Sequence, residues 1–79
     1  MRSKTSSAVI DVIASLSERS AADIREAHTL RGELGMDRIA VLQLTTELAE
    51  RFDVDVEAKH VRRFRTVGDV IAYFAGVKP

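Results

Sequence analysis

The segment Leu34-Gly35-Met36-Asp37-Arg38-Ile39 decides the fold, because it joins a stretch with little periodicity to one with strong periodicity. Residues 20–36 contain two glycine breaks, whereas the apolar residues after Asp37 recur at the spacing of one helix face. An aspartate directly before such a run is typical of a helix N-cap, where its carboxylate accepts a free backbone amide. We therefore predict a helix that begins at this segment and runs to Phe52.

The apolar residues of the helix predicted over 37–52 fall on two sides. One side must face the core, and it consists of Val41, Leu44, Leu48 and Phe52. A second side carries Ile39 and Leu42 and is continued by Thr46. This second side docks a partner if it is exposed, and it widens the buried stripe if both of its flanks are covered. The sequence leaves both interpretations open.

Two structured segments precede this helix. The first is a predicted helix over about 6–18, with Thr5 and Ser6 as capping candidates. Its inward face consists of Val9, Ile10, Val12, Ile13 and Leu16. Residues 20–36 then form a predicted long loop, with one short helical turn at Ser20-Ala21-Ala22-Asp23. Spaced apolar residues should pin this loop to the core, namely Ile24, Leu30 and Leu34.

Two further segments follow the central helix. A short helix is predicted over 58–64, with Val61 and Phe64 facing inward. The sequence Thr66-Val67-Gly68-Asp69 is typical of a capping box, so a last helix should begin there and end at Gly76. Its inward face consists of Val67, Val70, Ile71 and Phe74. These four residues have the spacing of one continuous helix face.

The chain as a whole is predicted to be one small all-α domain. The segments make a four-helix bundle over residues 5–77, with a long loop between the first two helices and a short third helix. With 79 residues, 46% hydrophobic and 30% charged, the composition is ordinary for a small globular protein. No apolar run could span a bilayer, and Asp11 interrupts the apolar stretch after the basic, serine-rich residues 1–7. We expect a cytoplasmic monomer that does not bind membranes.

Enzymatic and nucleic-acid-binding functions are not expected. Cysteine is absent, and the two histidines, His28 and His60, lack spaced partners for a catalytic triad or a metal site. We therefore expect no catalytic residue and no metal ligand. Twelve basic and twelve acidic side chains give zero net charge, which does not indicate a nucleic-acid binder.

The segment at 34–39, together with later positions, resembles the acyl carrier protein family. The shared pattern comprises Leu34-Gly35-x-Asp37, the face Leu44, Leu48 and Phe52, and Thr66-Val67-Gly68-Asp69. In that family the first motif reads Leu-Gly-x-Asp-Ser-Leu, and the serine hydroxyl takes a 4′-phosphopantetheine arm. The resemblance implies a carrier that tethers acyl or aminoacyl groups as thioesters. It also implies an acyl-chain cavity walled by Val56, Val61, Phe64 and Ile71, although such residues are first of all ordinary core.

Arg38 departs from the family pattern at the attachment position. The resemblance implies that Gly35, Asp37 and Arg38 are the cofactor-binding positions, and Gly35, Asp37 and Ile39 match the motif. A guanidinium stays protonated and offers only hydrogen-bond donors, so Arg38 cannot accept the arm through oxygen. We expect no cofactor on this chain. The departure is either a natural loss with a new role or an introduced substitution.

The resemblance implies partners that transfer or modify acyl groups, and an arm-transferring enzyme. Family members usually present an acidic second helix to basic patches on these enzymes, whereas residues 59–65 of this chain are rich in basic side chains. Because charge complementarity governs docking, the partners should carry unusual electrostatics. The candidate partner-binding residues are Ile39, Leu42, Thr46, Lys59, Arg62 and Arg63.

Two functions remain open at this point. The first is a carrier of acyl or aminoacyl thioesters whose attachment residue has been replaced. The second is a carrier-like adaptor or regulatory module that binds partner proteins non-covalently without an arm. Both predict the same fold, and they differ in what happens when serine is restored at position 38.

Overall fold

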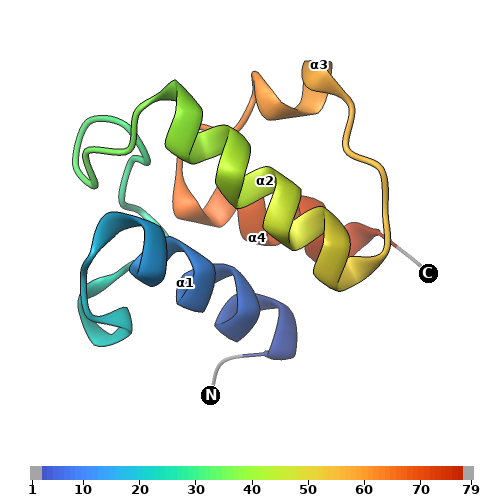
Figure 1. Cartoon of the computed structure of the whole chain (residues 1–79). Helices are drawn as coiled ribbons and strands as arrows, with labels where there is room; N and C mark the ends of the chain where they lie inside the picture. Colours follow the sequence, from blue (N-terminus) through green and yellow to red (C-terminus); the bar gives the residue numbers. More distant parts are fainter. Residues whose placement is uncertain (1–2, 78–79) are drawn as a thin grey trace.

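A computed structural model describes residues 3–77 as an all-helical fold. Its elements are α1 (Lys4–Ser17), the 3-10 turn η1 (Ala21–Asp23), α2 (Arg38–Phe52), α3 (Ala58–Val61) and α4 (Val67–Gly76). Within these residues no strand forms, and the β-type pairing is one isolated antiparallel bridge between Thr29 and Thr66. The long loop between α1 and α2 and the short α3 are both visible in Figure 1. The predicted small four-helix bundle is confirmed.

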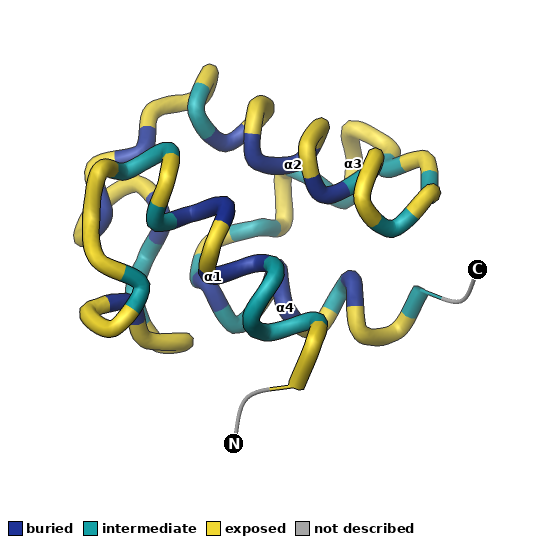
Figure 2. Tube along the Cα trace, turned by 60° about the horizontal axis from the view of Figure 1, so that its bottom comes forward, coloured by how far each residue is buried: buried dark blue, intermediate teal, exposed yellow. Residues whose placement is uncertain are grey.

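The core lies where α1 packs against both α2 and α4. Figure 2 shows the buried residues on the sides of these helices that face one another. The helices contribute Val9, Ile10, Val12 and Ile13 from α1, Val41, Leu44 and Leu48 from α2, and Val67, Val70, Ile71 and Phe74 from α4. The predicted inward faces are therefore buried, with Leu16 and Phe52 packed half-buried at their ends. Removing these side chains from water is the main force that holds the bundle together.

The N-terminus of α1 differs from the prediction. The N-cap is Ser3, which has extended backbone and whose hydroxyl accepts a hydrogen bond from the Ser6 amide at 3.1 Å. The predicted capping candidates Thr5 and Ser6 are wrong, because both lie inside the first turn. A serine-rich start offers several possible caps, and only the packing of the helix selects one. Met1 and Arg2 of the basic start lie outside the described residues.

The long loop is fixed to the start of α4 by backbone hydrogen bonds. The Leu30 amide donates to the Arg65 carbonyl at 2.9 Å, and the Val67 amide donates to the His28 carbonyl at 3.0 Å. Buried loop backbone needs such partners, because an unpaired polar group away from water is costly. The predicted anchors Ile24, Leu30 and Leu34 are all buried, and Met36 is a further buried residue that the sequence reading did not name.

The third helix is shorter than the predicted 58–64. It ends at Val61, and the next residues form a turn in which the Phe64 amide donates to the Val61 carbonyl at 3.1 Å. The tighter turn brings Phe64 against Tyr73 of α4, with ring centroids 5.4 Å apart. Val61 and Phe64 are half-buried against the core, as their predicted inward orientation requires.

The predicted capping box opens α4. The Thr66 hydroxyl accepts from the Asp69 amide at 3.1 Å, while the Asp69 carboxylate accepts from the amides of Thr66 and Arg65 at 3.0 Å each. These two backbone hydrogen bonds favour the ionised carboxylate and lower the pKa of Asp69 below its usual 3.8. The helix includes Gly76, the predicted stop, as its last residue, and Val77 caps it.

Candidate functional site

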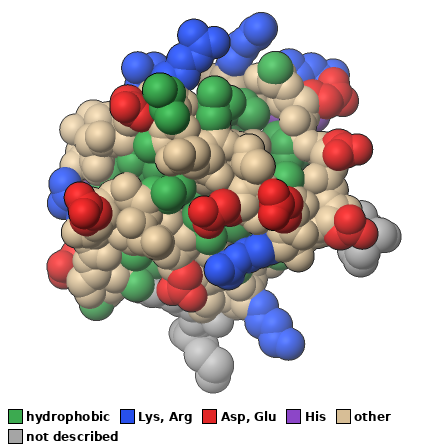
Figure 3. All heavy atoms as spheres, viewed as in Figure 1, with side chains coloured by type: hydrophobic (Ala, Val, Ile, Leu, Met, Phe, Trp, Pro, Cys, Tyr) green, Lys and Arg blue, Asp and Glu red, His purple; other side chains and the backbone are tan. Residues whose placement is uncertain are grey.

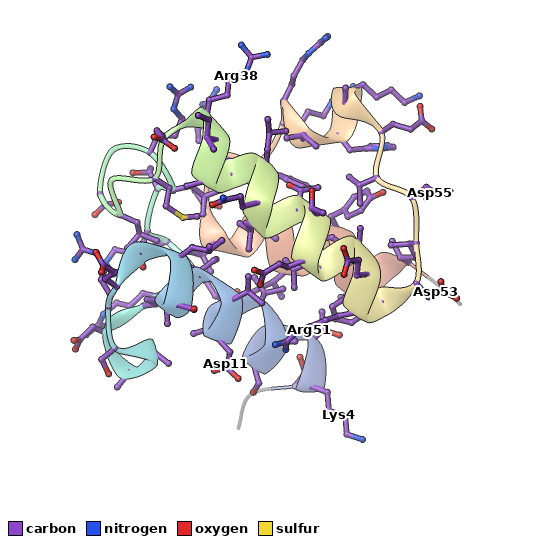
Figure 4. All side chains as sticks on the ribbon, in the orientation of Figure 1. Lys4, Asp11, Arg38, Arg51, Asp53 and Asp55 are labelled. Carbon is purple, nitrogen blue, oxygen red and sulfur yellow. The ribbon has the colours of Figure 1, made fainter. Side chains whose placement is uncertain are left out.

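The first turn of α2 is built around Asp37. This residue has extended backbone, and its carboxylate accepts a hydrogen bond from the Ala40 amide at 2.8 Å. Arg38 is therefore the first helical residue, and its exposed side chain extends away from the other helices in Figure 4. The predicted N-cap is confirmed. A cation at this position opposes the positive end of the helix dipole, and the neighbouring Asp37 carboxylate offsets part of that cost.

The loop before α2 is held in place on either side of Gly35. The Leu34 amide donates to the Thr29 carbonyl at 3.0 Å, and the Met36 amide donates to the Leu30 carbonyl at 2.9 Å. Leu34 and Met36 are both buried, and the chain turns at the residue between them. Gly35 makes this turn with φ +66, a left-handed conformation that is unfavourable for other residues. The glycine of the motif therefore has a conformational role in aiming the start of α2.

Gly35→Ala should lower the free energy of unfolding by about 1–2 kcal/mol, because the added Cβ disfavours the left-handed backbone. Space is not the reason, since no atom lies within 4 Å of the added Cβ position. Gly76→Ala is the matched control, because that Cβ also meets nothing and the helical backbone there suits alanine. The control should be neutral or stabilising by about 0.4–1 kcal/mol. Urea unfolding followed by circular dichroism compares the two, and equal effects would contradict the conformational role.

The start of α2 does not fit a 4′-phosphopantetheine ester, because it carries no hydroxyl. Arg38 occupies the helix position to which the resemblance assigns the attachment serine. The hydroxyls of α2 belong to Thr45 and Thr46, two turns further along. Each is engaged with its own helix, donating to the Val41 and Leu42 carbonyls respectively at 2.9 Å. No oxygen nucleophile therefore stands on α2 at the position where the arm would be attached.

Beside Arg38, the second apolar side of α2 is exposed. Ile39 is 67% exposed and Leu42 is 48% exposed. Together with Thr46 and with Leu16 of α1 they line a shallow hollow of about 350 Å³ between α1 and α2. The interpretation in which this side is buried on both flanks is wrong, because no element of residues 3–77 covers it. Its role in binding a partner stays a prediction.

A second hollow lies between the first half of α2 and α3, and it has a basic rim. Its volume is about 460 Å³, and its lining consists of Arg31, Arg38, Val41, Leu42, Ala58, Val61, Arg62 and Phe64. We call it the arginine pocket. Figure 3 shows Lys and Arg side chains along the edge of the molecule, over the start of α2 and over α3. Sequence reasoning missed Arg31, because the loop that carries it has no periodicity to indicate which way a side chain faces.

The predicted basic residues of the third helix, Lys59, Arg62 and Arg63, lie in three different surroundings. Arg62 lines the arginine pocket with Arg38. Lys59 instead forms an exposed ion pair with Glu57, with 3.7 Å between the Lys59 nitrogen and the Glu57 oxygen. Arg63 lines a different hollow, next to α4. An exposed pair of this kind contributes little to stability. The candidate residues of the third helix and its end therefore do not line one hollow.

The predicted wall of an acyl-chain cavity is also divided. Val61 and Phe64 line the arginine pocket, and Ile71 is buried in the core. Val56 lines a separate hollow at the far end of α2, together with the acidic side chains of Glu50, Asp53 and Asp55. The four residues therefore do not surround one cavity in this conformation. Val61 and Phe64 meet one hollow that opens to solvent, and Val56 meets another.

The described residues were searched for metal-binding clusters and for helices that could span a membrane. Within residues 3–77 no group of three or more His, Asp or Glu side chains is placed to hold a metal ion. Among the helices of the same residues, none has the length and apolar character that crossing a bilayer requires.

Comparison with known proteins identifies the family. Residues 7–74 match the family model described as phosphopantetheine attachment site. An acyl carrier protein of Exiguobacterium sp. strain AT1b is 29% identical over 68 residues, covering 82% of this chain and 86% of that protein. An acyl carrier protein of Chlamydia felis is 32% identical over 53 residues, covering 67% and 68%.

A solved structure gives the same result at the level of the fold. A Mycobacterium tuberculosis protein assigned as an acyl carrier protein superposes with a TM-score of 0.83 at 28% identity, covering 90% of this chain and 95% of that one. Acyl carrier proteins carry intermediates and are not catalysts, and the family uses 4′-phosphopantetheine. The family match, the relatives and the fold agree, and the chain therefore belongs to the acyl carrier protein family.

Proposed function

We propose that this chain is a carrier-fold adaptor in the cytoplasm that binds acyl-transferring or acyl-modifying enzymes non-covalently, without an arm at position 38. The observation that supports it most is Arg38 at the first position of α2, where the family needs a hydroxyl. A guanidinium cannot be esterified, so the usual loading chemistry has no acceptor here. The frame around that position is otherwise complete, with Asp37 capping the helix and Gly35 turning the loop.

The exposed side of α2 supports partner binding. Ile39 and Leu42 are the large apolar side chains that the described residues leave exposed, and both lie within one helical turn of Arg38. Exposed apolar groups cost free energy in water, and a partner that covers them recovers it. Apolar side chains next to arginine are also a common composition for a binding surface. The proposal assigns Ile39, Leu42 and Thr46 to this surface.

A second candidate function is a thioester carrier whose attachment serine has been replaced in this chain. The intact matches at Gly35, Asp37 and Ile39 favour it, and two of them shape the segment before position 38: Gly35 turns the loop and Asp37 caps α2. The two candidates share the fold and the docking surface. The second candidate requires that Arg38→Ser can be loaded, and an Arg38→Ser variant that folds but cannot be loaded leaves only the first.

Ile39→Asp should weaken binding to a partner enzyme by tenfold or more, since it places a charge in an apolar contact. The protein is titrated into a purified acyl-transferring enzyme and, separately, a broad-specificity arm-transferring enzyme, with affinity measured by calorimetry. Ala22→Asp is the control, because it adds the same charge at an exposed position in η1, away from α2. The adaptor proposal fails if the unaltered protein binds neither enzyme, or if the two variants lose affinity equally.

A further inference from the structure

We propose that Arg31, Arg38 and Arg62, the rim arginines, bind an acidic segment of a partner protein in which carboxylates stand beside an apolar side chain. This inference rests on the proposed function, because it states the chemistry that the adaptor would recognise in its partner. The observation behind it is a combination of charges: the three rim arginines line one hollow, and no acidic side chain does. The partner surface is therefore negative, the opposite of the basic patches that an acidic second helix would meet.

The rim arginines come from three separate segments of the chain. Arg31 lies in the loop before α2, Arg38 is the first residue of α2, and Arg62 caps the end of α3. All three are exposed. A guanidinium stays charged at all physiological pH values and can hold both oxygens of a carboxylate. Because packing brings the three to one hollow, a segment with adjacent carboxylates can contact more than one of them at once.

The acidic side chains of this protein do not neutralise the rim. Within residues 3–77 none of the rim arginines forms an ion pair. The nearest acids in sequence are Glu33 and Asp37, and their carboxylates accept the backbone amides of Thr29 at 3.0 Å and Ala40 at 2.8 Å. Neither acid lines the arginine pocket. The rim arginines are therefore available to carboxylates from outside the chain.

The other basic side chains near α3 have acids beside them. Lys59 pairs with Glu57, and Arg63 lines a hollow to which Asp69 also contributes. The positive charge that a partner would meet is therefore concentrated at the rim of the arginine pocket. This separates Arg62 from its neighbour Arg63, although the two residues have the same charge and are adjacent in sequence.

The rim is continuous with the exposed apolar side of α2. Leu42 lines both the arginine pocket and the hollow between α1 and α2, and Ile39 lines the second of these. One surface therefore offers arginine and large aliphatic side chains next to each other. Arginine beside apolar groups is typical of protein interfaces. A partner segment can fill both parts of this surface if it carries carboxylates beside an apolar residue.

The charge at the other end of α2 argues against a nucleic acid or an anionic membrane surface as the occupant. Asp53 and Asp55 stand at the opposite end of the helix from Arg38 in Figure 4. With Glu50 they line a separate hollow that repels anions. A polyanion that extends along α2 would meet this hollow, and the chain has zero net charge to attract one. A short acidic protein segment can contact the rim without reaching the acidic end.

The test uses two synthetic peptides, each with a central Leu-Trp pair. The acidic peptide has Glu on both sides of this pair, and the basic peptide has Lys in place of every Glu. The protein contains no tryptophan, so the fluorescence of the peptide reports binding to the full chain. The acidic peptide should bind at least about tenfold more tightly than the basic one, and its affinity should fall with added salt.

Other polyanions serve as competing occupants in the same assay. They are an oligothymidylate and vesicles of equal parts phosphatidylserine and phosphatidylcholine, and each should bind more weakly than the acidic peptide. Tighter binding of either one would overturn the proposal in favour of a nucleic acid or a membrane surface. Equal binding of the two peptides, or no binding of the acidic peptide at about 1 mM, would also overturn it.

Variants locate the binding surface. Arg31→Gln and Arg62→Gln should each weaken binding of the acidic peptide by about three- to tenfold. Arg63→Gln is the matched control, because it removes the same charge next to Arg62 and from a different hollow. It should change the affinity by no more than about twofold. Equal losses in Arg62→Gln and Arg63→Gln would contradict the assignment, and circular dichroism verifies that each variant folds.

Charge reversal gives a result that loss of folding cannot imitate. Arg62→Glu should weaken binding of the acidic peptide and strengthen binding of the basic peptide, because it places a carboxylate at the rim. Arg63→Glu should not produce this exchange of preference, since Arg63 lies outside the arginine pocket. Arg62→Glu that weakens both peptides equally would overturn the proposal.

Binding to the acyl-transferring enzyme separates this inference from the proposed function. Arg62→Gln should lower the association rate and the salt dependence of enzyme binding, because charges at the rim of an interface act mainly on the encounter. Enzyme binding that depends on Ile39 and is unaffected by Arg62→Gln would overturn this inference and leave the adaptor function. Binding of the acidic peptide that depends on the rim arginines, with no binding to either enzyme, would support this inference and defeat the proposed function.

Discussion

Arg38→Ser should gain one 4′-phosphopantetheine arm when it is incubated with coenzyme A and a broad-specificity arm-transferring enzyme, whereas the unaltered chain should gain none. The substitution restores a hydroxyl at the first position of α2, in a turn that Asp37 and Gly35 already hold. A helix N-terminus also tolerates a phosphodiester well, because its free amides and dipole favour negative charge. Intact-protein mass spectrometry decides between the two outcomes, since each molecule either carries the added mass or does not.

Two controls make this result specific. Arg38→Ala removes the cation without supplying a hydroxyl, and it should stay unmodified. Arg51→Ser introduces the same residue at an exposed position near the other end of α2, and it should also stay unmodified. Modification of Arg38→Ser alone supports a carrier whose attachment residue has been replaced. An Arg38→Ser variant that folds but remains unmodified would eliminate the carrier interpretation and leave the arm-free adaptor.

Phe74→Ala should lower the free energy of unfolding by about 3–5 kcal/mol, the largest stability effect that we expect of a single substitution in this chain. Phe74 is 1% exposed, and its ring stacks on Phe52 of α2 with centroids 5.3 Å apart. It also meets the edge of the Tyr73 ring at 5.1 Å. The truncation therefore removes a large apolar surface, leaves a cavity and breaks two aromatic contacts.

Thermal unfolding should show this loss as a fall in Tm of about 12 °C or more, because a domain of this size loses roughly 4–8 °C per kcal/mol. Ile39→Ala is the control, since it truncates an apolar side chain that is already in water. The control should change stability by no more than about 0.5 kcal/mol. A loss in Ile39→Ala comparable to that in Phe74→Ala would show that the second side of α2 is covered after all.

The helices and their main caps could be predicted from the sequence because they depend on local spacing. The faces of α1, α2 and α4 repeat at three and four residues, and burial follows that repeat. The starts of α2 and α4 could be predicted from capping side chains, because Asp37 caps α2 and Thr66 with Asp69 forms the capping box of α4. The family resemblance assigns Arg38 to the attachment position, and the lack of a hydroxyl there follows from residue type alone.

The errors concern choices that depend on distant packing. Ser3 caps α1 in place of two equally suitable neighbours, and α3 ends early where Phe64 turns toward Tyr73. Met36 is buried in a loop whose backbone is held by the hydrogen bond from the Met36 amide to the Leu30 carbonyl. None of these follows from the residues nearest in sequence. Each depends on how the loop and the helices pack against one another in the folded protein.

The sequence by itself determined the helices of this small four-helix fold, because periodicity and capping are local properties, and its resemblance to the acyl carrier protein family assigns Arg38 to the attachment position. The tertiary structure alone decided that Ile39 and Leu42 remain exposed. It also decided that Arg31, Arg38 and Arg62 meet around one pocket. These residues come from a loop and two helices that are brought together only when the buried apolar faces pack. Exposure and convergence are properties of that packing, and no spacing within one segment encodes them.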